Sequence, residues 1–333
     1  MVAVEAVVEV RRGSYIESVH SFAACVVDAA GDVIEAIGDV DYALPIRSLA
    51  KPFIAAEFVR SGAADAFGFG ETEIALSAGS HDGEPIHIDA VGKMLERLGL
   101  DESALECGPA LEGKIRVGSP LANNCSGKHA AVLAMCRHYD LPIQSYINPG
   151  HPLQRKLVPR LMLDFGRDPA STDIAIDGCG LPIFGATLKE IASAFARFGS
   201  SNEHAVRRAR SAMAARPEYV GGSHSNLDTS VISGSSRRVL GKIGAEGLHA
   251  DCLVDSGIGL AIKIIDGNSR ALPAALSGFL WRLAANNGAS TTWLSDLESP
   301  LVYNAAGNAV GDIRRGTRRV SIHNAILRSE EMR

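Results

Sequence analysis

Strand-like segments at both ends of this chain, separated by helical patterns, restrict its fold more than any other feature. Residues 2–10, 22–28 and 33–37 are apolar and rich in β-branched side chains, as strands are. Residues 250–254 and 259–265 repeat this pattern near the other end, on either side of a turn-forming triplet. The two groups predict one antiparallel sheet to which both ends of the chain contribute.

Helical periodicity dominates the middle of the chain. Apolar residues recur there at intervals of three and four, and Gly or Pro often marks the segment ends. The strands 301–303 and 309–313 are expected to extend the sheet, so the prediction is an α+β fold with helices packed on an antiparallel sheet. The predicted helices are residues 48–61, 72–78, 85–98, 127–138, 152–165, 186–198, 203–215 and 271–285.

No tandem repeat, low-complexity tract or linker interrupts the sequence. This predicts a single domain over residues 1–333, and a helical subdomain near residues 70–215 is an alternative arrangement within it. Residues 216–238 are rich in Gly, Ser and Asn, and are predicted to form a mobile surface loop or an active-site flap.

The composition excludes several classes of function. Of the 333 residues, 46% are hydrophobic and 21% charged, and the net charge is −5, as is typical of a soluble globular protein. A mildly acidic chain has no basic field to hold nucleic acid, and no apolar run reaches the length of a membrane span. The first residues include Glu5 and no basic stretch before an apolar run, unlike a signal peptide. We therefore expect a cytoplasmic protein without nucleic-acid or membrane partners.

The chain has an even number of cysteines, which permits disulfides. Disulfide frameworks are typical of small secreted domains, and this chain is neither small nor evidently exported. Free thiols or a metal site are therefore expected. The cysteines are Cys25, Cys107, Cys125, Cys136, Cys179 and Cys252.

The segment RSLAKPF, residues 47–53, is the first candidate for chemistry. Ser48 stands where a helix should begin, and Lys51 follows three positions later on the same helical face. A lysine whose pKa is lowered by burial can take the proton of a serine hydroxyl, and the helix N-terminus favours developing negative charge. The alternative is that Ser48 caps the helix and Lys51 is a surface lysine.

Two further polar sites follow different elements. Ser80 opens the segment SHDGE between two predicted helices, where the alternative to a catalytic loop is a capping loop. Lys263 interrupts the apolar strand GLAIKII and could project into a cleft. Its alternative is an edge-strand lysine whose amine reaches solvent.

Two Gly-flanked polar segments contain the remaining candidates. Residues 123–129 include Cys125 and His129, and residues 177–180 include Asp177 and Cys179. Two cysteines, a histidine and an aspartate are plausible zinc ligands, although the spacing is not CxxC. A buried pair of unreactive thiols is the alternative.

Eight segments together resemble one family, the rhizobial-type L-asparaginases or L-asparaginase II family. They occur in the family's order and extend over roughly residues 10–325. The combination is specific, although each motif alone is not. The segments are RSLAKPF (47–53), SAGSHDGEPIH (77–87), NNCSGKHAAVLAMC (123–136), PGHPLQ (149–154), DGCGLP (177–182), RPEYVGG (216–222), KIGAEG (242–247) and GIGLAIKIIDG (257–267).

The resemblance implies a fold similar to that of serine β-lactamases, penicillin-binding proteins and glutaminases. It implies hydrolysis of L-asparagine to L-aspartate and ammonia through an acyl-enzyme. The family's two Ser–Lys pairs match Ser48 with Lys51 and Ser80 with Lys263, and Ser48 is the expected nucleophile. A homodimer is the usual state of the family.

The resemblance also implies a zinc ion beside the serines. The family's ligands match Cys125, Lys128 and Cys179, with Asp177 close by through water. A lysine ligand must be neutral, which is unusual, and the adjacent His129 could take the place of Lys128.

An amino-acid substrate presents a carboxylate and an ammonium group, and both need fixed partners. Arg47 and Asp177 have the right charges and lie beside the motifs, and His81 and His129 are further candidates for substrate contacts. Three other functions stay open: a glutaminase, whose pocket would differ by a methylene worth about 1–3 kcal/mol, another amide or β-lactam hydrolase, and a non-catalytic zinc-binding protein.

Overall fold

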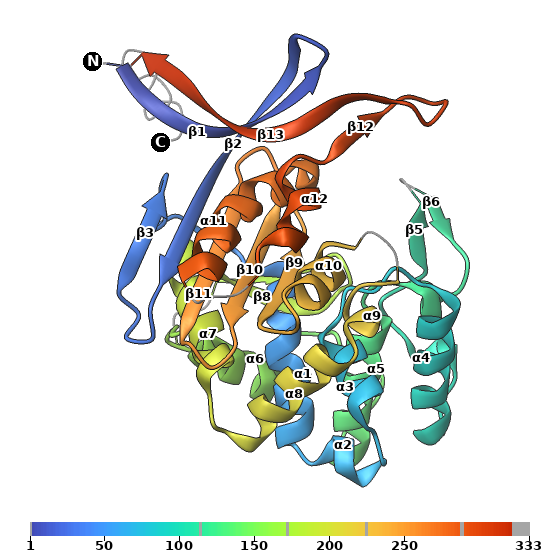
Figure 1. Ribbon diagram of the computed structural model, residues 1–333. Helices are drawn as coiled ribbons and strands as arrows, with labels where there is room; N and C mark the ends of the chain where they lie inside the picture. Colours follow the sequence, from blue (N-terminus) through green and yellow to red (C-terminus); the bar gives the residue numbers. More distant parts are fainter. Residues whose placement is uncertain (1, 113–114, 171–172, 224–225, 287–289, 322–333) are drawn as a thin grey trace.

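The computed structural model describes residues 2–112, 115–170, 173–223, 226–286 and 290–321, and these form an α+β fold (Figure 1). The strands are β1 (Val2–Arg12), β2 (Tyr15–Val27), β3 (Val33–Ile37), β4 (Ala43–Pro45), β5 (Ala110–Glu112), β6 (Ile115–Val117), β7 (Ile174–Ile176), β8 (Pro182–Thr187), β9 (Val239–Gly244), β10 (Leu248–Leu253), β11 (Ile258–Ile264), β12 (Leu301–Tyr303) and β13 (Ala309–Ser321). The α-helices are α1 (Lys51–Arg60), α2 (Ala63–Ala66), α3 (Glu71–Ala78), α4 (Pro85–Arg97), α5 (Ser126–His138), α6 (Gln154–Asp164), α7 (Leu188–Ser200), α8 (His204–Ala215), α9 (Pro217–Val220), α10 (Leu227–Gly234), α11 (Leu272–Asn286) and α12 (Ser295–Glu298). Short 3₁₀ turns are η1 (Arg47–Ala50), η2 (Glu102–Ala104), η3 (Pro120–Ala122), η4 (Ser269–Ala271) and η5 (Thr292–Leu294).

The first and last strands lie side by side in the main sheet. β1 pairs antiparallel with β13 in a register that runs from Val2 opposite Ser321 to Arg12 opposite Gly311. The strand order is β12-β13-β1-β2-β11-β10-β9, and β3 pairs with β2 outside this path. The predicted fold class, an antiparallel sheet built from both chain ends and packed with helices from the middle, is confirmed.

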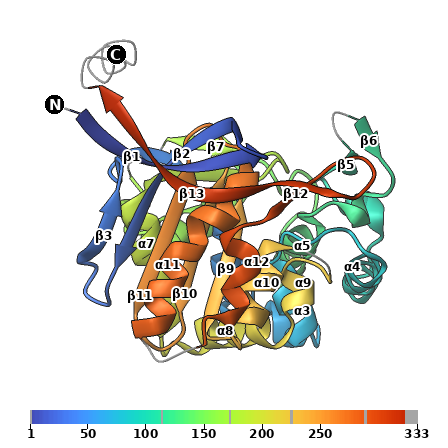
Figure 2. The same cartoon turned by 45° about the horizontal axis from the view of Figure 1, so that its top comes forward.

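Helices cover both faces of this sheet. α11 packs over β11, β1 and β13 on one face, and α7 packs on β2, β10 and β11 on the other (Figures 1 and 2). The alternation of side chains along β2 supplies both contacts: Phe22 meets Phe279 of α11, while Ala23 and Cys25 join the core on the α7 side. The sheet is therefore buried between two apolar layers. Its end strand β9 contacts the helical half of the molecule through α8, α10 and η1.

The helical half is held to the sheet through α1. Phe53 on α1 is buried, and its ring centroid lies 4.7 Å from that of Phe165 and 5.5 Å from that of Phe195. Truncating a buried phenylalanine costs about 3–5 kcal/mol. This packing fixes the start of α1, where the first candidate site begins.

The prediction of a loop over residues 216–238 is wrong for most of that stretch. It contains α9 and α10 and leads into the end strand β9, although residues 224–225 lie outside the described residues. Val231 and Ile232 of α10 are fully buried, and their packing outweighs the Gly- and Ser-rich composition.

α11, with 15 residues, is the longest helix among the described elements. A membrane-spanning helix needs about 20 predominantly apolar residues. Over the described ranges, no helix has the length and apolar character to cross a membrane.

Candidate active site

Ser48 and Lys51 lie where η1 runs into α1. Ser48 is half-buried in the 3₁₀ turn, and Lys51 is fully buried at the first position of the helix, followed by Pro52. Arg47, just before Ser48, has a φ of +49°, a left-handed conformation that is uncommon outside glycine. The predicted helix start at Ser48 is thus a 3₁₀ turn with a strained entry, and the alternative in which Lys51 is a surface lysine is excluded.

The amine of Lys51 contacts two neutral acceptors. It donates hydrogen bonds of 2.9 Å to Oγ of Ser80 and to the carbonyl oxygen of Asn124. The pKa of Lys51 is lowered to about 8, mainly by burial; the cations of Lys128 and Lys242 contribute to the lowering, and the thiols of Cys125 and Cys179 oppose it. The structure therefore brings Lys51 together with Ser80, with a pKa suited to a general base near neutral pH.

Close backbone packing holds Ser80 in place. A Cβ at Gly79 would lie 2.6 Å from the carbonyl oxygen of Tyr219, so only glycine lets these two segments approach. The backbone N–H of Ser80 then donates to the carbonyl of Val220 at 2.8 Å. Residues about 140 positions later in the chain therefore fix the segment SHDGE. A simple helix cap or a free loop would not be held in this way.

A hydrogen-bonded turn aims the carbonyl of Asn124 at Lys51. The side-chain oxygen of Asn123 accepts from the backbone N–H of Cys125 at 2.9 Å, and its amide group donates to three carbonyls of residues 107–109. This turn also ends at the N-terminus of α5, so Cys125 and Lys128 enter the site from the same element.

A thiol pair forms the second half of the site. Cys179 follows β7 in a tight turn closed by Gly180, whose φ is +91°, and Cys125 approaches it from α5. A hydrogen bond from Cys125 to Cys179 lowers the pKa of Cys179 to about 5 and raises the pKa of Cys125 to about 12. Nζ of Lys128 donates to Sγ of Cys179 at 3.0 Å. A thiol and an ammonium group beside Cys179 therefore favour its thiolate form.

Arg47 and Asp177 form an ion pair beside the thiols. Nε of Arg47 donates to Oδ1 of Asp177 at 2.7 Å, and Oδ2 of Asp177 lies 3.7 Å from Nζ of Lys128. Burial raises the pKa of Asp177, but the cation of Lys128 and the bond from Arg47 outweigh it and hold the pKa at about 2. The two residues predicted to bind substrate charges thus meet each other.

The predicted substrate contacts His81 and His129 are buried inside the protein. Nε2 of His81 lies 3.0 Å from Oγ of Ser126, and Nδ1 of His129 lies 2.6 Å from the hydroxyl of Tyr146. Burial lowers the pKa of His81 well below its usual value and the pKa of His129 to about 3, so both are neutral. Among the described residues, Nε2 of His129 has no hydrogen-bond partner, which leaves one buried polar atom near the thiol pair for a bound group.

The sequence pairing places Lys263 beside Ser80, but the structure does not bring these two residues together. Lys263 is half-buried on β11, and its amine donates at 2.6 Å to the carbonyls of Glu246 and Ile264. Lys242 lies closer to the site, because its strand β9 packs against η1. Its charge also lowers the pKa of Lys51. The motif KIGAEG contained this residue, and a lysine inside the apolar strand VLGKIG was the signal that could have identified it.

All six cysteines are free, as expected from the sequence. Within the described part of the chain, no three His, Cys, Asp or Glu side chains are arranged as metal ligands. A metal at the thiol pair would therefore need the amine of Lys128 as a third ligand, close to two sulfur atoms. Soft thiolates with a nitrogen donor suit zinc, and the buried unpartnered nitrogen of His129 offers a further donor, so the residues fit such an ion.

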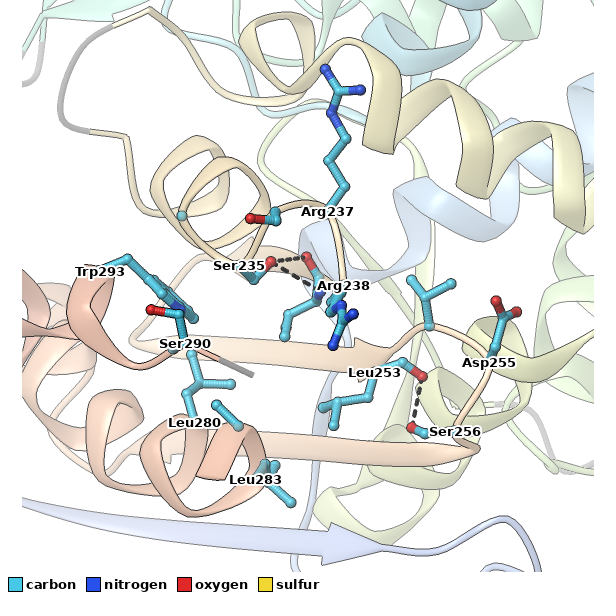
Figure 3. A pocket seen from close by; sticks show the side chains of 15 residues that line it. Ser235, Arg237, Arg238, Leu253, Asp255, Ser256, Leu280, Leu283, Ser290 and Trp293 are labelled. Carbon is cyan, nitrogen blue, oxygen red and sulfur yellow. Dashed lines mark hydrogen bonds between the residues drawn. The ribbon is translucent and has the colours of Figure 1, made fainter. Parts of the chain in front are cut away.

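A separate cavity of about 570 Å³ lies between the end of α10, the β10–β11 turn and α11 (Figure 3). Leu253, Leu280 and Trp293 line its apolar side, and Arg238 stands at its polar side. None of the predicted site residues lines this cavity, so it is distinct from the Ser–Lys and thiol cluster.

Comparisons with known proteins identify the class of this chain. The family profile of L-asparaginase II matches residues 8–315, so the protein is an amidohydrolase. The chain belongs to the L-asparaginase II family. No curated protein matches its sequence significantly.

The solved structures that match this chain share little sequence with it. A β-lactamase from Mycobacterium bovis is 15% identical, with a TM-score of 0.40, and the match covers 80% of this chain and 94% of that one. A protein designated Mglu, in its native form, is 14% identical, with a TM-score of 0.47, and the match covers 81% of this chain and 65% of Mglu. The match therefore spans less than two thirds of Mglu.

Proposed function

We propose that this protein hydrolyses L-asparagine to L-aspartate and ammonia. The observation that carries the proposal is the buried amine of Lys51, which has a pKa of about 8, a 2.9 Å hydrogen bond to Ser80 and a position three residues after Ser48. A base that is partly neutral near pH 7 and contacts a hydroxyl is what acyl transfer from an amide requires.

Ser48 is the proposed nucleophile. Its hydroxyl is half-buried and has no hydrogen-bond partner among the described residues, whereas the hydroxyl of Ser80 is already bonded to Lys51. Ser48 Oγ attacks the side-chain amide carbon, and its proton passes to the neutral amine of Lys51, directly or through Ser80. The C–N bond then breaks, the proton goes to the departing nitrogen, and ammonia leaves a β-aspartyl ester, which water hydrolyses.

Lys242, and not the sequence-predicted Lys263, is the second lysine of the proposed mechanism. Its cation on β9 adds positive charge beside η1, where the oxyanion of the tetrahedral intermediate would form. Backbone N–H groups at the start of α1 are candidates for the oxyanion hole itself.

Arg47 and Asp177 are proposed to hold the α-carboxylate and α-ammonium groups of the substrate. Their charges are opposite to those groups, and their ion pair lies next to Ser48. On binding, the ion pair between Arg47 and Asp177 would be replaced by two ion pairs, one from each residue to the substrate. Little net charge is therefore buried on binding.

Zinc is proposed to bind Cys125, Cys179 and Lys128. When bound, the ion would supply a fixed positive charge that orders the pocket. Lys128 would have to release its proton to the solvent, because only a neutral amine can bind a metal. The low pKa of Cys179, about 5, already provides one thiolate ligand.

The remaining proposals concern the protein's surroundings. Six free cysteines are consistent with a reducing compartment, which supports a cytoplasmic location. The acidic net charge of −5 supports the absence of nucleic-acid partners. A homodimer is proposed from the resemblance to the family.

The test of the function is ammonia release from L-asparagine and L-glutamine side by side, at equal low concentration. The proposal expects faster release from asparagine, and ester trapping on Ser48 by acid quench and peptide mass spectrometry. Equal rates on both amides would remove the asparagine specificity, and an acyl group on Ser80 would move the nucleophile. The matched control is Ser61→Ala, a serine at the other end of α1.

A further inference from the structure

Lys242 belongs to a cluster of buried charged residues. The cluster contains Lys242 on β9, Asp228 on α10, and His249 and Asp251 on β10, and all four residues have 0% exposed surface. Buried charges are costly unless they are paired, so each member needs a reason to be there. The proposed chemistry uses only Lys242.

Asp228 bonds the same edge strand at two points. It lies in the first turn of α10, where the helix dipole favours a carboxylate. Oδ1 accepts the backbone N–H of Ile243 at 2.7 Å, and Oδ2 accepts a short hydrogen bond from Nζ of Lys242. The carboxylate therefore fixes the backbone of β9 and the tip of the lysine side chain together.

The amine of Lys242 has one hydrogen left over. Two of its three N–H groups go to Asp228 and to the carbonyl of Ile243, at 3.0 Å for the latter. Within the described part of the chain, no third acceptor contacts this amine. A lysine side chain has several rotatable bonds, and two fixed contacts leave its third N–H in one direction.

His249 and Asp251 form a separate pair on the neighbouring strand. Nε2 of His249 lies 3.0 Å from Oδ1 of Asp251, and Nδ1 of His249 lies 3.8 Å from Oδ1 of Asp228. Asp251 thus contacts the histidine and not Lys242. This makes Asp251 a matched comparison: an equally buried carboxylate in the same cluster that does not hold the lysine.

We propose that Asp228 is a positioning residue, which holds the amine of Lys242 so that its remaining N–H serves the reacting oxygen. This inference rests on the proposed function of the Ser–Lys site. A purely structural Asp228 would stabilise β9 and α10 without any dependence on Lys242. A positioning Asp228 acts on the reaction only through Lys242, and the two roles can be separated.

The experiment is a double-mutant cycle of Asp228→Asn and Lys242→Met, with Asp251→Asn as the control. Rates of ammonia release and melting temperatures are measured for each variant. We expect Asp228→Asn to lower kcat by about 10–100-fold with KM little changed, as for supporting groups in other sites, and Asp251→Asn to keep kcat within about threefold. In the Lys242→Met background, Asp228→Asn should lower kcat by less than about threefold, because members of one unit are not additive.

An undiminished kcat in folded Asp228→Asn would overturn the proposal, and so would an equal loss of kcat with and without Lys242. If Asp228→Asn does not fold, Asp228→Glu decides, because it keeps the charge but moves it by one methylene. A reduced kcat in Asp228→Glu supports positioning, and a normal kcat refutes it.

A second readout separates this inference from the proposed function. A fluorophosphonate probe labels activated serines without any amide substrate, and its labelling rate is measured by mass spectrometry for the same variants. If the wild type labels but hydrolyses neither amide, the proposed function fails, and slower labelling of Asp228→Asn still supports the positioning role. Equal labelling of both proteins would refute it, and a wild type that neither labels nor hydrolyses would overturn both.

Discussion

Two buried lysines of the site, Lys51 and Lys128, have nearly the same exposure, but their pKa values are shifted in opposite directions. Lys51 is 0% exposed and Lys128 3%. Burial lowers the pKa of Lys51 to about 8, because its direct contacts are a hydroxyl and a carbonyl. Burial also lowers the pKa of Lys128, but the thiols of Cys179 and Cys125 and the carboxylate of Asp177 more than reverse this and raise it. The neighbours, and not the depth, decide which lysine can give up its proton.

This difference divides the site into two halves. The half around Lys51 and Ser80 contains a base that can exchange a proton near neutral pH. Without zinc, the half around Lys128 and Cys179 contains charges that stay fixed over the same range, and one of them, the Lys128 cation, acts on Lys51. We therefore expect changes in the first half to affect the rate of the chemical step, and changes in the second half to affect binding.

The largest effect is expected from Lys51→Met. Methionine fills the buried space but cannot take a proton, so kcat for ammonia release should fall by about 10³-fold or more. The control is Lys93→Met, which removes an exposed lysine of α4 that pairs with Asp89. A Lys51→Met protein within tenfold of the wild type would show that another group is the base.

A smaller effect, and on a different constant, is expected from Cys179→Ser. The substitution removes the thiolate that pairs with Lys128, and with it a ligand of the proposed zinc ion. KM should rise by about 10–100-fold, the usual cost of losing a supporting group in a metal site, while kcat falls less. Initial rates over a range of asparagine concentrations separate the two constants, and elemental analysis reports the zinc.

Cys136→Ser is the matched control for this variant. Cys136 is buried on α5 but belongs to the apolar core, so its loss should change stability and leave KM unaltered. If kcat of Cys179→Ser collapses while KM stays constant, the thiol half takes part in the chemistry and the division fails.

The smallest effect is a shift of the pH profile. Lys51 must be neutral to accept a proton, so kcat/KM should rise with pH through an apparent pKa near 8. In the zinc-free protein Lys128 is a cation that lowers the pKa of Lys51, so Lys128→Met should move this rising limb to higher pH, by up to about one unit. Rates between about pH 6 and pH 10 test this. An unmoved limb, or one that moves to lower pH, would mean that the two lysines are not coupled.

Sequence patterns predicted what depends on local spacing. The periodicity after Ser48 was enough to predict that a helical segment begins there, and the β-branched ends were enough to predict that the terminal strands share a sheet. The partner of Lys51 was not predictable in this way. Ser80 reaches Lys51 because Val220, far along the chain, holds its backbone.

The choice between Lys263 and Lys242 shows the same limit. Both lysines interrupt apolar strands, and the period-two pattern assigns each lysine to one face of its strand. The pattern does not tell which of the two strands lies at the end of the sheet, next to η1. That information lies in the strand order, which no local pattern contains. Helix α10 was missed because tertiary burial of Val231 outweighs local composition.

The pairing of β1 with β13 has a consequence for synthesis of the chain. The strand β1 leaves the ribosome well before its partner β13, which begins at residue 309, about 300 residues further along the chain. At about 5–20 residues per second, the delay is on the order of tens of seconds. During that time one edge of β1 has no neighbour and can pair with another chain. Nascent or prematurely terminated chains of this protein should therefore depend on chaperones more than the finished molecule does.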